Sequence, residues 1–409
     1  MADELAVWLY GERVAMIDRE RGRPRLVYTG EALSRYALGT PLLSLSMPVG
    51  DRRYTQGLVS PFLDGLLPEG ESRKAIAREK AVRVDDTYGL IRELGRDCAG
   101  AVVIQPADDP PPPRASTLTA EVLGPEEIGA LVENLRSAPL GAGGRVRISL
   151  AGVQEKLLLT RMPDGKWGRP VDGTPSTHIL KPEIAAYPQT VENEAFCMRI
   201  AKNLGLDVAA VETTEIGKRK LIVVERYDRA VSVDGSVERI HQEDFCQATG
   251  IAPERKYEED GGPSLQQIAG ILQSVAATDS LERFLQAVTL NVLVGNGDAH
   301  AKNFSLLHDA SGVLTLTPLY DLMCTQHYGD DRLAMYIDTV QRTSRVTAER
   351  IANEAMRWGM SRGRASGTIG DILERAPAAM ATAREETDGV PEKMIDTIER
   401  QLHQLRTTQ

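Results

Sequence analysis

The chain has 409 residues, of which 42% are hydrophobic and 26% are charged, and its formal net charge is −10. This composition is typical of an ordinary soluble globular protein, and the length allows two or three domains. The acidic balance argues against a protein that holds nucleic acid over its whole surface. It does not exclude a local basic patch, or contact with DNA through a partner.

Neither a membrane span nor a secretion signal is predicted. No apolar run approaches the roughly 18 residues of a membrane helix, and the N-terminus begins acidic, without the basic and apolar regions of a signal peptide. The four cysteines, Cys98, Cys197, Cys246 and Cys324, are widely spaced and form no CxxC pair. Buried free thiols are therefore expected rather than a disulfide framework or a zinc site. We expect a cytoplasmic protein.

The first hundred residues predict a small antiparallel sheet followed by helices. Strand-like runs at 5–10, 12–17 and 25–28 are separated by glycine and charged turns. Helical patterns follow at 61–67 and 73–80. Residues 105–116 then contain four consecutive prolines beside acidic and small residues, which favours an extended connector. We place a domain boundary there, after a first domain of residues 1–108.

The elements predicted after the connector begin as strands and become helical. They are strands at 145–149, 157–160, 177–181, 211–216 and 220–225, one helix at 191–204, and later helices at 281–294 and over much of 346–408. A strand-rich part with one inserted helix, followed by a helical part, is the order of a two-lobed protein kinase-like fold. We therefore predict an α+β protein with a small N-terminal subdomain, a strand-rich lobe over 109–227 and a helical C-terminal lobe over 228–409.

The most specific motif is the run from Asn296 to Asn303, followed at a distance by Asp321. Asp298 and Asn303 have the spacing of the base and the first metal ligand in a kinase catalytic loop, and a later aspartate supplies the second ligand. Apolar or alternating runs at 304–307 and 313–317, around a turn at 308–312, predict a β-hairpin between the two sites.

Each residue of this motif has a predicted role. Asp298 orients or deprotonates the attacking hydroxyl, although the motif alone is also ordinary turn chemistry. Asn303 and Asp321 offer hard oxygen ligands that suit Mg²⁺. Lys302 is placed to neutralise charge on the transferred phosphate. For the lone His300, a packing or phosphate-adjacent role is favoured over metal binding.

The strand-rich lobe carries candidate phosphate contacts. Lys181 closes a strand, and Glu192 or Glu194 on the next helix would pair with it, as in kinases; a solvated strand end is the alternative. Residues 150–156 take the place of a phosphate-covering loop, although they contain one glycine and match neither Walker A nor GxGxxG. Ser149 at its edge is either a phosphorylatable hydroxyl or a turn former.

Two further segments have structural and functional interpretations. Residues 225–228 lie where the strand-rich lobe crosses to the helical lobe, so the backbone of Glu225 and Tyr227 is a candidate adenine contact, with a plain linker as the alternative. The polar block at 241–250 contains one histidine without a second at ligand spacing. A structural helix start, with Glu243 or Asp244 near its first turn, is therefore favoured over a metal site.

Taken together, these motifs resemble the HipA family of serine/threonine kinases, the toxins of HipBA-type toxin–antitoxin pairs. The matching segments are 149–156, 178–182, 224–229, 241–250, 297–305 and 320–321. Residue 227 is a tyrosine where phenylalanine is common in that family, and this change removes no required group.

The resemblance implies a kinase-like fold that uses ATP and Mg²⁺, with Asp298 as catalytic base and Asn303 and Asp321 as metal ligands. The ATP contacts it implies are Ala151, Gly152, Val153, Gln154, Glu155, Lys156, Lys181, Glu225, Arg226, Tyr227, His300, Lys302, Asn303, Tyr320 and Asp321. It also implies autophosphorylation of Ser149, which ejects the loop and inactivates the kinase. The physical reason is that a phosphate adds up to about two negative charges beside the bound triphosphate.

The resemblance further implies a small helix-turn-helix antitoxin as partner (HipB-like), with operator DNA reached indirectly through it. The implied substrate is a translation component, such as the glutamyl member of the aminoacyl-tRNA synthetases. Two other functions remain open at this point. One is a non-catalytic regulatory subunit of an antitoxin–DNA complex, and the other is a small-molecule kinase on the same scaffold.

Overall fold

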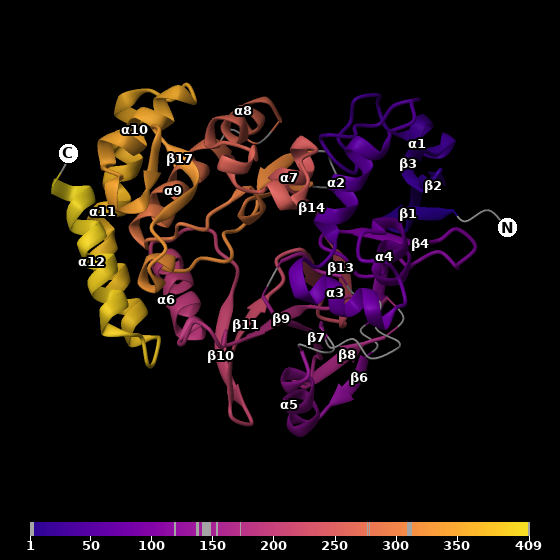
Figure 1. Ribbon diagram of the computed structural model, residues 1–409, viewed down its shortest axis with the longest axis horizontal. Coiled ribbons are helices and arrows are strands. Elements are labelled where there is room, and N and C mark those ends of the chain that lie inside the picture. Colours follow the sequence, from indigo (N-terminus) through magenta and orange to yellow (C-terminus); the bar gives the residue numbers. More distant parts are fainter. Residues whose placement is uncertain are drawn as a thin grey trace. The chain divides into compact units, whose positions relative to one another are not determined.

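The computed structural model describes residues 4–117, 120–135, 139–140, 149–152, 154–171, 173–275, 277, 279–308 and 313–407. The chain forms two compact units (Figure 1). The first unit comprises Met1–Pro182, Glu215–Pro253 and Leu307–Gly312, and the second comprises Glu183–Thr214, Glu254–Leu306 and Val313–Gln409. The predicted three-part division at residues 108 and 227 stays a prediction.

A four-stranded antiparallel sheet opens the first unit. Its strands are β1 (Leu5–Leu9), β2 (Glu12–Glu20), β3 (Arg23–Tyr28) and β4 (Val102–Pro106), in the order β3-β2-β1-β4. The three strands predicted near the N-terminus are confirmed. The fourth was not predicted, and it reaches β1 only after four helices: α1 (Gly30–Arg35), α2 (Gln56–Leu66), α3 (Gly70–Glu79) and α4 (Thr87–Leu94).

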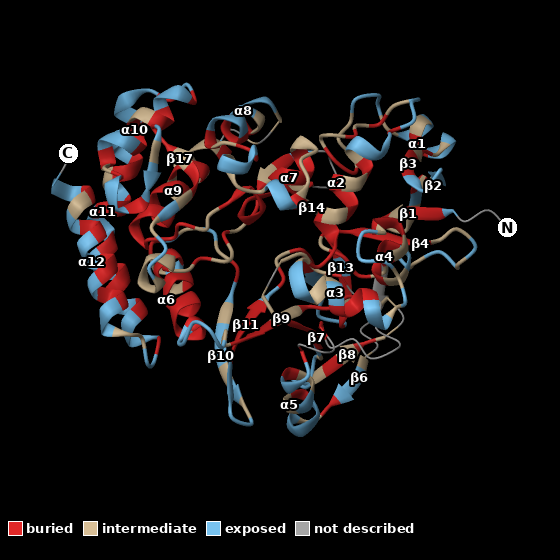
Figure 2. Cartoon of the chain, in the orientation of Figure 1, coloured by how far each residue is buried: buried red, intermediate tan, exposed pale blue. Residues whose placement is uncertain are grey.

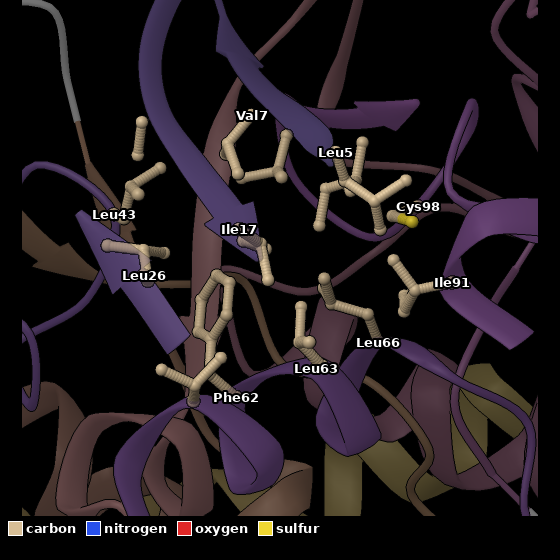
Figure 3. Packing of buried hydrophobic residues seen from close by; sticks show 14 of the residues in the cluster. Leu5, Val7, Ile17, Leu26, Leu43, Phe62, Leu63, Leu66, Ile91 and Cys98 are labelled. Carbon is tan, nitrogen blue, oxygen red and sulfur yellow. The ribbon is translucent and has the colours of Figure 1, made fainter. Parts of the chain in front are cut away.

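The core of this subdomain lies between the sheet and α2. Leu5, Ile17 and Leu26 of the sheet pack with Phe62 and Leu63 of the helix, as Figure 3 shows. The predicted helix at 61–67 in fact begins at Gln56 and continues through Pro61. Its buried residues Val59, Phe62, Leu63 and Leu66 have helical spacing. Their burial outweighs the backbone hydrogen bond that Pro61 cannot donate.

The second sheet of the first unit contains β6 (Ala120–Leu123), β7 (Leu157–Arg161), β8 (Trp167–Pro170), β9 (His178–Pro182) and β11 (Arg219–Glu225), in the order β11-β9-β7-β8-β6. Helix α5 (Pro125–Glu133) precedes β7, and β10 (Val211–Ile216) crosses from the second unit into the first. The predicted strands at 157–160, 177–181, 211–216 and 220–225 are confirmed. Of the predicted strand at 145–149, residues 145–148 lie outside the described residues.

The rest of the first unit is irregular or short. Residues 107–114 form turns and extended chain, as predicted for a proline-rich connector. A small sheet has the order β12-β13-β5, with β5 at Ala115–Thr117, β12 at Arg229–Val231 and β13 at Ser236–Arg239. Strand β14 (His241–Asp244) leads into α7 (Phe245–Thr249), whose N-cap is Asp244 within a capping box. This confirms the helix start predicted there.

The second unit is mainly helical. Its elements are α6 (Thr190–Asn203), α8 (Leu265–Val275), α9 (Ser280–Leu293), β16 (Leu314–Leu316), β17 (Arg332–Ile337), β18 (Val340–Arg342), α10 (Ala348–Arg357), α11 (Arg362–Glu385) and α12 (Glu392–Thr407). Strand β15 (Ser305–His308) begins in this unit and ends in the first. Short 3-10 turns occur at Pro253–Arg255, Glu258–Asp260, Ala301–Asn303, Thr325–Tyr328 and Thr343–Arg345. The predicted helices at 191–204 and 281–294 and the helical C-terminal segment are confirmed. So are both hairpin strands, whereas turn residues 309–312 lie outside the described residues.

Burial explains how these helices are placed. Residues 190–198 of α6 are all buried, whereas α10, α11 and α12 bury one side and expose the other (Figure 2). Gly205 at a φ of +72° ends α6, as predicted for a helix C-cap. All four cysteines are buried thiols. Among the described residues, no helix has the length and apolar character that a membrane crossing requires.

Candidate active site

The loop after α9 is held tightly against β17. Gly297 donates its N–H to Thr325 Oγ1 at 2.8 Å, and its carbonyl oxygen accepts the N–H of Ala334 at 2.7 Å. A Cβ at residue 297 would lie 2.2 Å from the carbonyl oxygen of Arg332, closer than atoms approach. Only glycine therefore fits here, and the fixed backbone sets where Asp298 begins.

Asp298 is half-buried and held from both ends. Its backbone N–H donates to the side-chain oxygen of Asn296 at 3.1 Å, and its carbonyl oxygen accepts the N–H of His300 at 2.8 Å. Its carboxylate Oδ1 accepts a hydrogen bond from the Tyr257 hydroxyl at 2.8 Å. This places the carboxylate in a defined rotamer at the start of the 3-10 turn Ala301–Asn303.

The electrostatics of Asp298 connect it with Asp321. Burial raises the pKa of Asp298 above its ordinary value, and the charge of Asp321 raises it further. The hydrogen bond from Tyr257 and the charge of Lys256 act in the opposite direction. The two carboxylates therefore share one partly desolvated environment with an excess of negative charge.

Lys302 and Asn303 follow in the 3-10 turn, and both are buried, with 8% of each exposed. The Asn303 N–H donates to the His300 carbonyl oxygen at 2.8 Å. The Lys302 carbonyl oxygen accepts the Tyr320 hydroxyl at 2.7 Å, and that hydroxyl also lies 2.6 Å from Ser305 Oγ. Tyr320 thus joins the catalytic turn to the segment that carries Asp321.

Asp321 has a φ of +58°, a left-handed conformation that aspartate tolerates better than most residues. Both backbone polar groups of Leu319, two residues earlier, form hydrogen bonds. Its N–H donates to Asp207 at 2.8 Å, and its carbonyl oxygen accepts from Ala209 at 2.9 Å. The structure therefore brings Asp298, Lys302, Asn303, Tyr320 and Asp321 into one region of the second unit.

His300 is a neutral imidazole at pH 7. Burial, and then the charge of Lys256, lower its pKa to about 3. Its ring meets the Tyr257 ring edge-on, with centroids 5.4 Å apart. Its Nδ1 atom is buried and has no hydrogen-bond partner among the described residues. The phosphate-adjacent role predicted for it stays a prediction. No cluster of three or more His, Cys, Asp or Glu side chains suited to a metal occurs in the described part of the chain.

In the first unit, the predicted phosphate loop is folded on itself. The Lys156 ammonium donates to the Ala151 carbonyl oxygen at 2.6 Å. A Cβ at Gly152 would lie 2.5 Å from Lys156 Nζ. Gly152 has a φ of +115°, and its carbonyl oxygen accepts the N–H of Glu69 at 3.3 Å. Gln154 donates its side-chain N–H to Pro182 at 3.4 Å, Glu155 is half-buried, and Val153 lies outside the described residues.

The Ser149 side chain at the edge of this loop is completely buried. Its hydroxyl donates to the Leu66 carbonyl oxygen at 2.5 Å, and its N–H donates to the Asp97 carbonyl oxygen at 2.9 Å. In this conformation its oxygen is closed to solvent. Lys181 is also buried, in register with Ile222 of β11. Glu192 and Glu194, its predicted partners, belong to the second unit, and the pairing stays a prediction.

The predicted hinge residues have different surroundings. The Arg226 N–H donates to Thr177 at 2.9 Å, so in the antiparallel register the N–H and C=O of Glu225 point away from β9. The Arg226 guanidinium is buried against Asp228 at 2.8 Å. The Arg226 carbonyl oxygen accepts the N–H of Arg229 at 3.2 Å, and the nucleotide contact predicted for Arg226 stays a prediction. Tyr227 is half-buried, and its hydroxyl binds Gln242.

Sequence reasoning missed Tyr257 and Lys256, although both act electrostatically on Asp298. Tyr257 precedes Asp298 by 41 residues and stands in no recognisable motif. Its place beside the catalytic loop depends on tertiary packing, which no local pattern reveals.

Comparison with known proteins shows which family this chain belongs to. Residues 148–380 match the family model described as the HipA-like C-terminal domain, and residues 5–105 match the HipA N-terminal domain. A putative kinase of Sinorhizobium fredii, Y4mE, is 38% identical, with 94% of this chain and 92% of that protein covered. The serine/threonine-protein kinase toxin HipA of Shewanella oneidensis is 33% identical, with 83% of this chain and 80% of that protein covered.

Among solved structures, the complex of HipA, HipB and operator DNA from Shewanella oneidensis MR-1 contains a chain with a similar fold. The TM-score is 0.83 at 27% identity, and the match covers 98% of this chain and 96% of the other. The strand-rich N-terminal part and the helical C-terminal part of this chain are consistent with the two family matches. This chain belongs to the HipA family and is a serine/threonine-protein kinase of mixed α+β fold.

Proposed function

We propose that this kinase transfers the γ-phosphoryl group of ATP to a serine or threonine of a protein, with Asp298 as base and Asn303 and Asp321 as Mg²⁺ ligands. One observation carries the proposal: the Asp298 carboxylate is fixed by Tyr257 at 2.8 Å and shares its electrostatic environment with Asp321. Phosphoryl transfer depends mainly on positioning and charge, which this arrangement supplies.

The residues present fit a magnesium ion. Asp321 raises the pKa of Asp298, so the pair carries negative charge that a cation would compensate. The Asn303 amide oxygen and the Asp321 carboxylate are hard oxygen ligands of the kind Mg²⁺ takes in kinases. Held by these two residues beside ATP, the ion would neutralise negative charge on the phosphates.

The other ATP contacts that we propose lie around this centre. Lys181, paired with Glu192 or Glu194, would hold the α- and β-phosphates. The loop 151–156 would cover them, and the backbone at 225–227 would meet the adenine. Lys302 would neutralise the transferred group, with His300 and Tyr320 beside it. Support for the hinge comes from the backbone of Glu225, which the register turns away from β9.

We further propose that Ser149 is the autophosphorylation site and that its phosphate switches the kinase off. The buried Ser149 hydroxyl cannot receive phosphate in place, so the segment must leave its contacts with Leu66 and Asp97 first. A phosphate of up to about two negative charges cannot return to this buried site, because its oxygens would face the Leu66 carbonyl oxygen that now accepts the serine hydroxyl. The modification would therefore hold the loop out.

The proposed biological setting is a cytoplasmic type II toxin–antitoxin pair. The similar chain from Shewanella oneidensis was solved with HipB and operator DNA. We propose that a small helix-turn-helix protein of the HipB kind binds this kinase and that operator DNA is reached through that protein, with the kinase as co-repressor. The net charge of −10 fits indirect rather than direct contact with DNA. The proposed substrate is an aminoacyl-tRNA synthetase or another translation component whose phosphorylation arrests growth.

The test is incubation of the full chain with γ-labelled ATP and Mg²⁺, with and without the glutamyl-tRNA synthetase of the same cell. We expect label on Ser149 and on the synthetase, lost in Asp298→Asn and kept in the exposed control Asp371→Asn. A folded protein that binds ATP but labels no protein would overturn the proposal. Label on an antibiotic or sugar would indicate a small-molecule kinase. Growth arrest unchanged by Asp298→Asn would indicate a non-catalytic regulatory subunit.

A further inference from the structure

Tyr257 connects the catalytic loop with a separate, internally bonded segment of the second unit. Its hydroxyl donates to Asp298 Oδ1 at 2.8 Å, and its ring packs edge-on against His300 at 5.4 Å. The neighbouring Lys256 carbonyl oxygen lies 3.5 Å from the N–H of Ala301, a long contact. Tyr257 and the residue before it thus contact the catalytic loop at more than one point.

The segment 255–262, here named the Tyr257 brace, is held together by its own internal hydrogen bonds. The Tyr257 carbonyl oxygen accepts the N–H of Asp260 at 3.0 Å and that of Gly262 at 2.9 Å. The Arg255 guanidinium donates to the carbonyl oxygens of Asp260 and Gly261, each at 3.1 Å. A Cβ at Gly262 would lie 2.2 Å from the Arg255 carbonyl oxygen, so the turn closes only with glycine.

The brace and the catalytic loop share one platform. Glu258 of the brace accepts the N–H of Tyr336 on β17 at 2.7 Å. Gly297 of the catalytic loop accepts the N–H of Ala334, on the same strand, at 2.7 Å. Both segments are therefore docked on β17, the brace through the Glu258 carboxylate and the catalytic loop through the Gly297 backbone, and this shared strand keeps Tyr257 beside Asp298.

We propose that Tyr257 is a positioning residue for phosphoryl transfer, which fixes the Asp298 carboxylate so that Oδ2 meets the attacking hydroxyl. The inference rests on the proposed role of Asp298. A hydrogen bond to an ionised carboxylate is stronger than a neutral one, so it restricts the rotation of the carboxylate. The Tyr257 hydroxyl acts here as the donor to this carboxylate, so its role is to orient Asp298 and not to serve as a base itself.

The main test is Tyr257→Phe, which removes the hydroxyl and keeps the ring against His300. Because misplacement of a reacting group costs up to about 100-fold, we expect kcat to fall about 10- to 100-fold. The KM for ATP-Mg should stay unchanged, so that the loss appears in kcat alone. Tyr336→Phe is the matched control, because it removes a hydroxyl from the same unit for which no hydrogen bond is found in the described part of the chain, and it should retain full kcat.

A double-mutant cycle separates positioning from general structural support. With Asp298→Asn as background, Tyr257→Phe should cause no further loss, because its effect passes through the carboxylate. Gly262→Ala, which moves the brace but keeps the hydroxyl, should also lower kcat. If Tyr257→Phe is fully active while Asp298→Asn is inactive, the proposed role of Tyr257 is overturned and the proposed base stands. Full activity of Asp298→Asn would overturn the proposed base, and this inference with it.

Discussion

The Ser149 hydroxyl donates a hydrogen bond of 2.5 Å to the carbonyl oxygen of Leu66, the last residue of α2. Its N–H is held by Asp97 at 2.9 Å, and its side chain has no exposed surface. A residue proposed as an autophosphorylation site is thus locked in the core of the first unit. We call these two hydrogen bonds, from Ser149 to Leu66 and to Asp97, the Ser149 lock. Because of them, Ser149 can be modified only after the segment at the start of the predicted phosphate loop is released.

A charged side chain at this position should open the segment. In Ser149→Asp the carboxylate faces the Leu66 carbonyl oxygen, without a donor to replace the lost bond, and burying an unpaired charge costs several kcal/mol. We expect faster limited proteolysis around residues 149–156 and a large loss of kinase activity. Ser149→Ala keeps the packing, so it should be cleaved as slowly as the wild type while taking up no label at this residue. Equal cleavage rates for the two variants would contradict the lock.

The Asp298 carboxylate, our proposed catalytic base, should reduce stability while it supports activity. Burial and Asp321 raise the pKa of Asp298, so its ionised form is disfavoured in the folded chain. Asp298→Asn removes this penalty, and we expect a higher thermal midpoint at pH 7 together with a loss of activity of about 100- to 10,000-fold. Below the raised pKa the wild-type carboxyl is protonated, so the difference in midpoint should disappear as the pH falls towards 3.8. Melting curves without nucleotide or metal, between pH 7 and pH 4, measure it. A variant that is less stable than the wild type at pH 7 would refute this account.

Two glycine substitutions should have opposite effects. In Gly297→Ala the new Cβ would meet a backbone oxygen at 2.2 Å, so the catalytic loop must move away from β17. We expect a loss of about 1–3 kcal/mol in the free energy of unfolding and nearly complete loss of activity. Gly367→Ala, exposed within α11 and without a neighbour inside 4 Å, should instead gain about 0.5–1 kcal/mol and keep its activity. Urea denaturation and a kinase assay on both variants decide the point.

A buried ionic cluster beside the predicted hinge should be critical for the stability of the first unit. Asp97 lies 2.8 Å from Arg229, and Asp228 lies 2.8 Å from Arg226, with Arg239 nearby. Burial alone would raise the pKa of Asp97, but the charges of the three arginines, together with the Ser176 hydrogen bond, hold it below its ordinary value.

Asp97→Asn leaves these arginines without half of their counter-charge, and we expect a loss of about 3–5 kcal/mol in the free energy of unfolding. Asp85→Asn, which removes an exposed surface pair with Arg83, serves as the control and should leave the denaturation midpoint unchanged. Similar midpoints for the two variants would show that the cluster contributes little.

Much of the secondary structure follows from local patterns. The strands β1, β2 and β3 contain short apolar runs separated by glycine turns, and α6 and α9 have helical spacing of apolar residues. Such patterns arise from the burial of residues within one element, so they can be recognised in a single segment of sequence. The extension of α2 through Pro61 was missed because local propensity disfavours proline there, whereas burial of its neighbours decides the outcome. The fourth strand, β4, was missed because its run is short and its partner β1 lies almost a hundred residues earlier.

The sequence alone determined the order of the candidate catalytic elements: an aspartate, an asparagine and a later aspartate around a hairpin, with a lysine strand and a glutamate helix upstream. Spacing along the chain is enough for this, because each motif is local. Only the tertiary structure decided that Tyr257 holds Asp298, that Asp321 shifts its pKa, and that Ser149 is sealed by Leu66 and Asp97. Such contacts join residues tens of positions apart, and their energy depends on burial and orientation, which exist only once the chain has packed.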